Sequence, residues 1–254
     1  MDIILYNIGS VIISLIIGYL FGSIPNSIWI GKVFFHKDPR DYGSGNAGGT
    51  NAGRVFGKKI GALVIFLDAI KLIIPLYAVW AILTFAPIYH GSPLVGDVYS
   101  VYVLGNNDFV IKWPVYWLVA IGCGLGHCYP LFAGFRGGKN VSSTVGLVVG
   151  VMWPSFIIGV VLYFGILKWK KYVSLASICT SWGAVIVSWV WAILLLAKVI
   201  PPSYSWLIGY GPTLDIGYVY AITLTFSAAL LTIKHKDNII RLKNGNERKI
   251  TWMK

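Results

Sequence analysis

The chain has 254 residues, of which 57% are hydrophobic and 12% are charged, and its mean hydropathy is +0.73. This is more apolar surface than one soluble core needs, so the composition excludes an ordinary soluble enzyme and predicts an integral membrane protein. The formal net charge is +12. We attribute it to cytoplasmic loops and their attraction to anionic lipid headgroups, and we expect no nucleic-acid partner.

Transmembrane helices are the elements that the sequence predicts most clearly. A helical span needs about 20 apolar residues, because a helix rises about 1.5 Å per residue across about 30 Å of hydrocarbon. Five apolar segments meet this requirement, at residues 3–30, 60–86, 111–132, 173–197 and 214–233.

The apolar segment 141–167 is ambiguous, because a single span there would leave the final helix pointing the wrong way. Pro154 divides the segment, since proline disfavours a helical residue before it and is tolerated in the first turn of a helix. We therefore predict two helices there, the first only about 12 residues long. This gives about seven transmembrane helices, with one short helix among them.

The basic residues test this arrangement. Six Lys or Arg lie in residues 32–59, two at Arg136 and Lys139, three in 168–171 and seven in 234–254, which is 18 of the 21 in the chain. The positive-inside rule places all four segments in the cytoplasm, with the N-terminus outside and the C-terminus inside. The predicted fold is therefore all-α, polytopic, and a single membrane domain over residues 1–254.

The first chemically informative stretch, GSGNAGGTNAGR at residues 43–54, lies in a predicted cytoplasmic loop. It formally matches the GxGxxG pattern of dinucleotide folds, but that pattern needs a preceding strand, and here a predicted transmembrane helix precedes it. Glycines would let backbone N–H groups approach an anion, and Arg54 would add a bidentate cation. A plain glycine-rich turn is the alternative. The predicted anion-binding residues are Gly43, Ser44, Gly45, Asn46, Thr50, Asn51 and Arg54.

A second glycine-rich stretch is GHCYPLFAGFRGGKNVSSTVG, residues 126–146. Gly137, Gly138 and Lys139 precede the predicted short helix, so free N–H groups and the positive end of the helix dipole would face a bound anion. This is not a nucleotide P-loop, because Ala133 stands where that motif requires its first glycine. A lysine that snorkels from a helix end is the alternative for Lys139.

The third stretch is KHKDNIIRLKNGNERK, residues 234–249. His235 and Asn238 are three residues apart, so we expect them on one face of a helix, with Arg241 approximately on the same side. A basic tail next to the membrane is the alternative, but it explains His235, Asn238 and Glu247 less naturally than it explains the lysines.

Two further pairs at the same spacing lie in predicted spans. Ser174 and Ser177 stand at the cytoplasmic mouth of the sixth span, where small residues could also serve helix packing. Asp68 and Lys71 form an i,i+3 pair within the second span, which we interpret as neutralisation of charge inside the membrane. His127 is expected to be a packed polar residue, and we expect no metal site.

Four motifs, GSGNAGGTNAGR, GHCYPLFAGFRGGKNV, YVSLAS and KHKDNIIRLKNGNERK, occur in this order along nearly the whole chain. In this the sequence resembles the bacterial acyl-phosphate-dependent glycerol-3-phosphate acyltransferases, the PlsY family. It departs from the family pattern at Gly49, where members usually have Ala, at Asn140, where they usually have Gly, and in its long exterior loops.

The resemblance implies transfer of a fatty acyl group from acyl phosphate to the 1-hydroxyl of sn-glycerol 3-phosphate. The products would be 1-acylglycerol 3-phosphate (lysophosphatidic acid) and phosphate, in the first acylation of phospholipid synthesis. It also implies a multi-pass protein of the bacterial plasma membrane whose active site faces the cytoplasm. The expected partners are acyl phosphate, glycerol 3-phosphate and membrane lipids, without a cofactor.

The resemblance further assigns residues. The implied catalytic residues are Ser44, Arg54, Lys139, His235 and Asn238, with Arg54 and Lys139 binding phosphate. The implied substrate-binding residues are Gly43, Gly45, Asn46, Thr50, Asn51, Gly137, Gly138, Ser174, Ser177, Arg241 and Glu247. The family is thought to use the phosphate of its substrate as the general base, and His235 is the alternative base.

Two other classes of protein stay open. One is an acyltransferase that uses acyl-CoA or acyl carrier protein, and we expect this chain to lack its characteristic spacing of His and Asp, five residues apart. The other is a transporter of phosphate or organic anions, since short helices interrupted by glycine also build anion pathways. The basic residues, however, gather on the predicted cytoplasmic side and not at the middle of the membrane.

Overall fold

The computed structural model describes residues 2–85, 87–89, 92–93, 100–102, 110–112, 115–200 and 217–250. Within these ranges the body of the protein is helical. The α-helices are α1 Asp2–Gly22, α2 Asn26–Phe35, α3 Gly49–Phe56, α4 Lys58–Phe85, α5 Trp117–Cys128, α6 Val141–Val151, α7 Trp153–Lys170, α8 Val173–Leu196, α9 Tyr218–Lys234 and α10 Lys236–Lys243.

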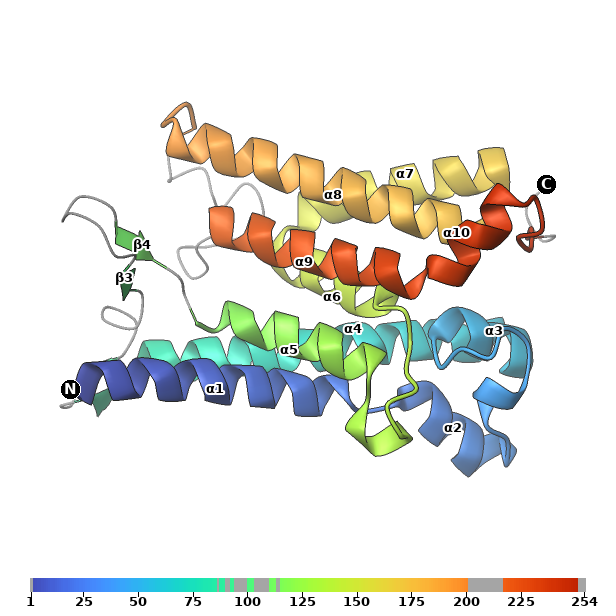
Figure 1. Ribbon diagram of the computed structural model, residues 1–254, viewed down its shortest axis with the longest axis horizontal. Coiled ribbons are helices and arrows are strands. Elements are labelled where there is room, and N and C mark those ends of the chain that lie inside the picture. Colours follow the sequence, from blue (N-terminus) through green and yellow to red (C-terminus); the bar gives the residue numbers. More distant parts are fainter. Residues whose placement is uncertain are drawn as a thin grey trace.

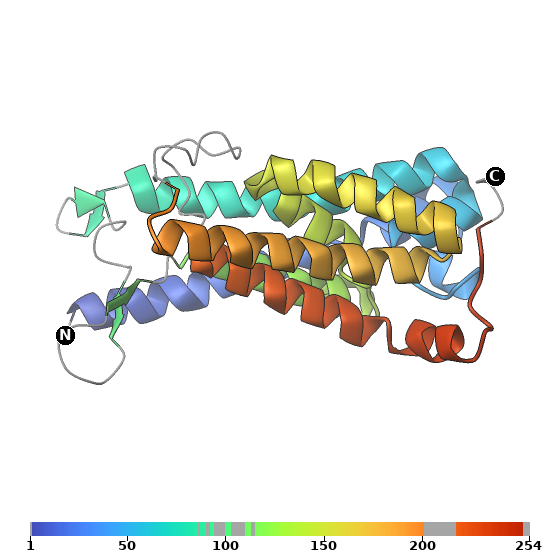
Figure 2. The ribbon, with the colours of Figure 1, turned by 90° about the horizontal axis from the view of Figure 1, so that it is seen from above.

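Four short strands add to the predicted all-α fold. β1 (Pro87–Tyr89) pairs antiparallel with β2 (Ser92–Pro93), and β3 (Ser100–Tyr102) pairs antiparallel with β4 (Val110–Lys112). They lie at the end of the molecule where α1 begins (Figures 1 and 2). The helices α2, α3 and α10 lie at the opposite end, so the two ends of the molecule differ in structure.

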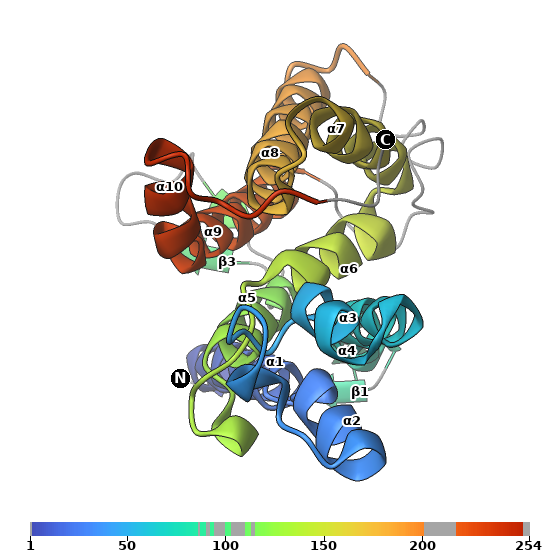
Figure 3. The ribbon, with the colours of Figure 1, turned by 90° about the vertical axis from the view of Figure 1, so that its right-hand side faces the viewer.

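The long helices form two groups. In one group α1 packs against α5 and α4, and in the other α8 packs against α7 and α9. Figure 3, viewed along the helices, shows α6 between the two groups. The short α6 therefore brings the loop that precedes it to the boundary between them.

Burial follows this arrangement. Trp117, Tyr220, Leu72 and Leu224 are fully buried in the core between the helices, whereas outward-facing apolar residues such as Ile186 are exposed. Many large apolar side chains on the outer faces of the helices are exposed in this way, which is typical of a lipid-facing surface. Among the described residues, three helical stretches are long and apolar enough to cross a membrane, at Ile8–Phe35, Lys58–Leu83 and Val173–Leu196. The helical membrane fold is confirmed, and the count of seven spans stays a prediction.

The predicted break at residue 153 is confirmed. α6 has 11 residues and ends at Val151, Met152 leaves the helical conformation, and α7 begins at Trp153 with a proline in its first turn. Pro154 therefore separates one short helix from one long helix, as the sequence predicted.

The predicted span at 3–30 is not one continuous helix. α1 ends at Gly22 and α2 begins at Asn26, because Pro25 disfavours helix at the residue before it. The break is held by the buried pair in α4. Lys71 Nζ lies 2.9 Å from Asp68 Oδ1 and donates to Ile24 O at 2.8 Å. The expected neutralisation is confirmed, and it also ties the break to α4.

Two other boundaries differ from the predictions. Residues 111–112 belong to β4, and α5 is shorter than the predicted span at 111–132 because Pro130 follows its C-terminus. The predicted span at 214–233 corresponds to α9, and its residues 214–216 lie outside the described part of the chain.

The prediction of one helical face is wrong for His235 and Asn238, although Asn238 and Arg241 both lie in α10. α9 ends at Lys234, His235 has φ −96° and ψ 10°, and α10 begins at Lys236. The apolar sequence of α9 ends at Ile233, and the polar residues Lys234, His235 and Lys236 form the junction with α10. The side chains of His235 and Asn238 are nevertheless buried, at 4% and 8% exposure.

Candidate active site

A cavity of about 480 Å³ lies among α3, α6, α7, α8 and the junction of α9 with α10. This volume is typical of small-molecule sites, which span about 300–1,000 Å³. One part of its wall is polar, and its charged residues are mostly cations, among them Arg54 and Lys139. Another part is apolar, with Val148, Phe156 and Val160. The cavity can therefore hold a molecule that has an anionic head and an apolar tail.

Asn51, in α3, organises the first glycine-rich loop and is 1% exposed. Its side-chain oxygen accepts from the backbone N–H of Ser44 at 2.7 Å and from Ser44 Oγ at 3.0 Å. Its nitrogen donates to Pro39 O at 2.7 Å and to Asn46 O at 3.0 Å. The Asn51 amide, which we predicted to contact substrate, is thus engaged in shaping the loop that presents Ser44.

The polar part of the cavity is positively charged. Burial lowers the pKa of Arg54, and the nearby Arg248 lowers it further. Burial also lowers the pKa of Lys139, with Arg241 as the next cause, and Lys139 Nζ donates to Asn238 Oδ1. Cations that are partly buried next to other cations favour a bound anion, because an anion restores the stabilisation that water no longer supplies.

Glu247 holds the C-terminal segment on this cationic part of the wall. Its Oε1 accepts from Asn238 Nδ2 and from Ser174 Oγ, both at 2.7 Å, and its Oε2 accepts from Arg241 Nε at 2.8 Å. Burial alone would raise the pKa of Glu247, but these hydrogen bonds together lower it. Ser174, Arg241 and Glu247 line the cavity as predicted, and they also bind one another.

His235 enters the site as a neutral ring. Its Nδ1 lies 2.8 Å from Leu231 O, and a carbonyl oxygen only accepts, so Nδ1 carries the proton and Nε2 is free to accept. Burial lowers the pKa of His235 to about 4, although the bond to Leu231 opposes this effect and Lys139 adds to it. The ring is therefore uncharged at neutral pH.

The second glycine-rich loop behaves differently from the prediction. The N–H of Gly138 donates to His127 O at 2.9 Å, and neither Gly137 nor Gly138 lines the cavity. The predicted role of Gly138 as a free donor is wrong, because its N–H joins the loop to α5. His127 itself is buried, at 5% exposure, as expected of a packed polar residue.

Most predicted site residues do line the cavity. They are Gly43, Ser44, Asn46, Thr50, Asn51, Arg54, Lys139, Ser174, Ser177, His235, Asn238, Arg241 and Glu247. Gly45, like Gly137 and Gly138, does not line the cavity, and its N–H donates to Tyr42 O at 3.1 Å.

Some residues of the cavity wall were not predicted. Tyr163 and Thr180 line it from α7 and α8, inside apolar spans where no motif marks them. Ser142 lies in the first turn of α6, next to the predicted anion loop, and its position there was the available signal. Arg248 contributes a cation and donates to Gly43 O at 3.4 Å, a contact across 205 residues that no local pattern indicates.

Two expectations about side-chain chemistry can be compared with these positions. The spacing of His and Asp five residues apart does occur, at His36 and Asp41, so its expected absence is wrong. Both residues are exposed and neither lines the cavity, so the spacing marks no site here. In the described part of the chain, no group of three or more His, Cys, Asp or Glu side chains could hold a metal ion.

Comparison with known proteins assigns the chain to a family. The family model described as glycerol-3-phosphate acyltransferase matches residues 12–245. This chain belongs to the glycerol-3-phosphate acyltransferase family. The predicted resemblance to PlsY is thereby confirmed, and the cavity described above is the candidate active site of a glycerol-3-phosphate acyltransferase.

Relatives and solved structures agree with this assignment. The glycerol-3-phosphate acyltransferase of Staphylococcus saprophyticus is 35% identical over 96% of this chain and 99% of its own length. That of Listeria monocytogenes serotype 4a is 34% identical over 94% of this chain and 96% of its own length. The crystal structure of PlsY (YgiH), an integral membrane glycerol 3-phosphate acyltransferase in its glycerol 3-phosphate form, is 30% identical, with a TM-score of 0.68 over 95% of this chain and 96% of that one.

Proposed function

We propose that this glycerol-3-phosphate acyltransferase takes its acyl group from acyl phosphate and transfers it to the 1-hydroxyl of sn-glycerol 3-phosphate. The products are 1-acylglycerol 3-phosphate and inorganic phosphate. The observation that carries the proposal is that a wall with cationic residues adjoins an apolar wall in one and the same cavity. PlsY (YgiH), for which a glycerol 3-phosphate form and a lysophosphatidic acid form have been solved, supports the same substrate and product.

The two parts of the cavity would divide the substrates between them. Arg54 and Lys139 bind the phosphate groups, and charge-assisted hydrogen bonds to phosphate are stronger than neutral ones. The acyl tail lies along Val148, Phe156 and Val160. Membrane lipids surround the outer faces of the helices and supply the medium from which an acyl chain enters.

The reaction needs no protein nucleophile. The 1-hydroxyl oxygen of glycerol 3-phosphate attacks the acyl carbonyl carbon, a new ester bond forms, the bond to the phosphate oxygen breaks so that inorganic phosphate leaves, and the hydroxyl proton passes to the phosphate of glycerol 3-phosphate. Arg54 and Lys139 neutralise the departing phosphate. Ser44 Oγ donates to the amide oxygen of Asn51, which is not a base, so Ser44 lacks the partner that activates a nucleophilic serine.

The proton acceptor is the phosphate of the substrate. His235 is the alternative, since its Nε2 is free, but a ring whose pKa is about 4 is a weak base at neutral pH. His235 and Asn238 instead orient the acceptor. Asn238 lies between the ammonium of Lys139 and the carboxylate of Glu247, which fixes the direction of its amide.

Purified protein in detergent tests the proposal. It should form lysophosphatidic acid and release phosphate from palmitoyl phosphate plus glycerol 3-phosphate, and it should remain inert with palmitoyl-CoA. Mass spectrometry after incubation with the donor alone should show an unmodified chain. Efficient turnover of palmitoyl-CoA would contradict the donor, whereas a kinetically competent acyl adduct on Ser44 would contradict only the mechanism.

The orientation in the membrane is a further part of the proposal. We propose seven spans in a bacterial plasma membrane, a single domain, and a cationic part of the cavity that faces the cytoplasm, because four basic segments lie on that side. Single cysteines introduced at Ser44, Lys170 or Lys254 should not react with an impermeant reagent in intact cells, and cysteines at positions 92 or 205 should react. Labelling at position 170 would overturn the seven-span arrangement.

A further inference from the structure

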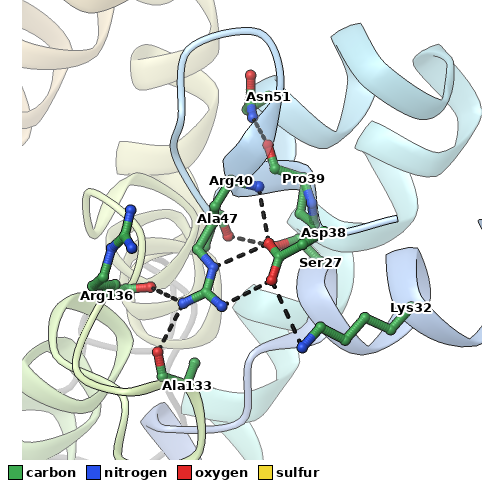
Figure 4. A network of polar contacts seen from close by, with 9 residues as sticks. All are labelled: Ser27, Lys32, Asp38, Pro39, Arg40, Ala47, Asn51, Ala133 and Arg136. Carbon is green, nitrogen blue, oxygen red and sulfur yellow. Dashed lines mark hydrogen bonds and ion pairs between the residues drawn. The ribbon is translucent and has the colours of Figure 1, made fainter. Parts of the chain in front are cut away.

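The two segments that carry the proposed phosphate-binding residues meet at one side chain outside the cavity. Loop 1, residues 36–48, carries Ser44 and leads into the helix that bears Arg54. Loop 2, residues 129–140, carries Lys139. Figure 4 shows Arg40 of loop 1 between them, with its guanidinium directed at backbone oxygens of loop 2.

The guanidinium of Arg40 uses both of its sides. Nε and Nη2 bind the two carboxylate oxygens of Asp38 at 3.0 and 2.8 Å, which is the bidentate geometry that suits an arginine. Nη1 donates to Ala133 O at 2.8 Å and to Arg136 O at 3.4 Å. Within the described residues, these last two bonds are the hydrogen bonds recorded between loop 1 and loop 2 (Figure 4).

The ion pair between Arg40 and Asp38 is largely shielded from solvent. The side chains of Arg40 and Asp38 are 17% and 13% exposed, and Asp38 also accepts from the backbone N–H of Arg40 at 3.0 Å. Hydrogen bonding to Asp38 raises the pKa of Arg40 and lowers that of Asp38. The guanidinium of Arg40 is already oriented by the Asp38 carboxylate, so it loses little side-chain conformational entropy when it also binds the two carbonyl oxygens of loop 2.

Short connections lead from Arg40 to the cavity in both directions. In loop 1, Arg40 belongs to the 3-10 helix Pro39–Asp41, and Pro39 O accepts from Asn51, which in turn holds Ser44. In loop 2, Arg136 is followed by two glycines and then by Lys139. Arg40 does not itself line the cavity, so it does not act by contact with substrate.

We propose that Arg40 is a positioning residue for acyl transfer, which sets the placement of Lys139 relative to Ser44 and Arg54 by tying loop 2 to loop 1. This inference rests on the proposed function, in which Lys139 and Arg54 hold phosphate. A displacement of about 1 Å in a group that orients a reacting substrate can cost about 100-fold in rate, so the loss of this tie should be measurable in kinetics.

The primary experiment compares Arg40→Met with Lys32→Met. Lys32 is a matched control, because its Nζ pairs with the same Asp38 carboxylate at 3.8 Å, is largely exposed, and does not reach loop 2. We expect Arg40→Met to lower kcat/KM for glycerol 3-phosphate by about 10- to 100-fold. We expect Lys32→Met to stay within about twofold of the unmodified protein.

A double-mutant cycle separates positioning from general damage. In a Lys139→Ala background there is no ammonium to misplace, so Arg40→Met should change kcat/KM by less than about twofold. If Lys139→Ala is impaired and Arg40→Met still has its full effect in that background, the positioning role is overturned while the proposed function stands. If Lys139→Ala alone has normal kinetics, the phosphate assignment fails and this inference fails with it.

A second variant keeps the test decisive if Arg40→Met does not fold. Arg40→Lys retains the charge and one contact to Asp38, but an ammonium cannot bind the carboxylate on two atoms and two carbonyls at once. It should fold and lose kcat/KM to an intermediate extent, again only when Lys139 is present. Normal kinetics of Arg40→Lys would overturn the proposal, because the simultaneous contacts of the guanidinium to Asp38 and to loop 2 would then be dispensable.

Discussion

The two glycine-rich loops look alike in sequence, but they use their glycines for different purposes. In the first loop, Gly43 and Gly45 have φ values of 63° and 68°, so the turn itself requires glycine. In the second, Gly137 lies so close to α5 that an added Cβ would stand 2.1 Å from His127 O. Gly134 of this loop also has a positive φ, of 61°, but Gly137 serves close packing, and the loop presents Lys139 to the cavity.

The difference shows that glycine content alone does not identify a phosphate cradle. The first loop places its own residues on the cavity wall, including Ser44 and Asn46, whereas the second contributes a charge at its end. Each loop therefore has one critical cation, Arg54 after the first and Lys139 in the second, and the surrounding residues determine where that cation lies. The following predictions test this division.

The largest effects are expected at the two cations. Arg54→Ala and Lys139→Ala each delete a charge-assisted contact to phosphate, which is usually worth about 1.5 to 3 kcal/mol, or roughly tenfold to over a hundredfold in kcat/KM. Steady-state kinetics with palmitoyl phosphate measure the loss, and the midpoint of thermal unfolding should stay unchanged. Normal kinetics in both variants would refute phosphate binding by these residues.

The second largest effect is expected at Gly137. Gly137→Ala forces a methyl group against the backbone of His127, and overpacking of this kind costs about 1 to 3 kcal/mol, so the unfolding midpoint and kcat/KM should both fall. Gly165→Ala is the matched control, because an added Cβ at Gly165 meets nothing within 4 Å. Equal behaviour of the two variants would show that close approach to α5 is not why loop 2 needs glycine.

The sequence predicts those parts of the molecule that have a local signal. Apolar segments and Pro154 predict the helices and the break before α7, and the spacing of Asp68 and Lys71 predicts their salt bridge. The break at Pro25 had such a signal too, but the continuous hydropathy around it favoured one long span. Four motifs separated along the chain predict most of the cavity wall, because each carries polar residues that an apolar span would not otherwise contain.

Long-range hydrogen bonds were not predictable. Glu247 accepts from Ser174, 73 residues away, and Arg40 donates to Ala133, 93 residues away. No period or motif joins such positions, because their contact depends on how the helices pack. For the same reason, the sequence could not show that Asn51 binds its own loop or that the N–H of Gly138 is already occupied.

A smaller effect is expected for Asn140→Gly. Asn140 has φ 63°, a left-handed conformation that Asn tolerates better than most residues, and its Nδ2 donates to Ser227 Oγ at 2.9 Å. Asn140→Gly keeps the backbone and loses this bond, so unfolding should become easier by about 1 kcal/mol. Asn140→Ala should cost about 1 to 2 kcal/mol more, because Ala is strained there. An Ala variant as stable as the Gly variant would contradict this explanation.

The two cations should also differ in their pH dependence. Lys139 can lose its proton, and burial lowers its pKa from the ordinary lysine value of about 10.4. As the pH rises, kcat/KM should therefore begin to fall before the pH reaches that ordinary value. The guanidinium of Arg54 does not lose its proton in this range. Lys139→Arg should therefore have lower activity but no alkaline fall, and a fall at the same pH in that variant would assign it to another group.

The smallest expected shift in the pH profile of kcat/KM is at His235, which belongs to neither loop. Because the folded-state pKa of His235 is lowered to about 4, the ring is neutral above that pH and does not titrate near 6.5. If the phosphate of the substrate is the base, kcat/KM should fall on the acid side at about pH 6, the second pKa of a phosphate monoester, and His235→Gln should leave that position unchanged. A fall near pH 4 that disappears in His235→Gln would instead identify His235 as the base. The measurement is the profile of kcat/KM against pH for both proteins, with Lys139→Ala as a reference that retains His235.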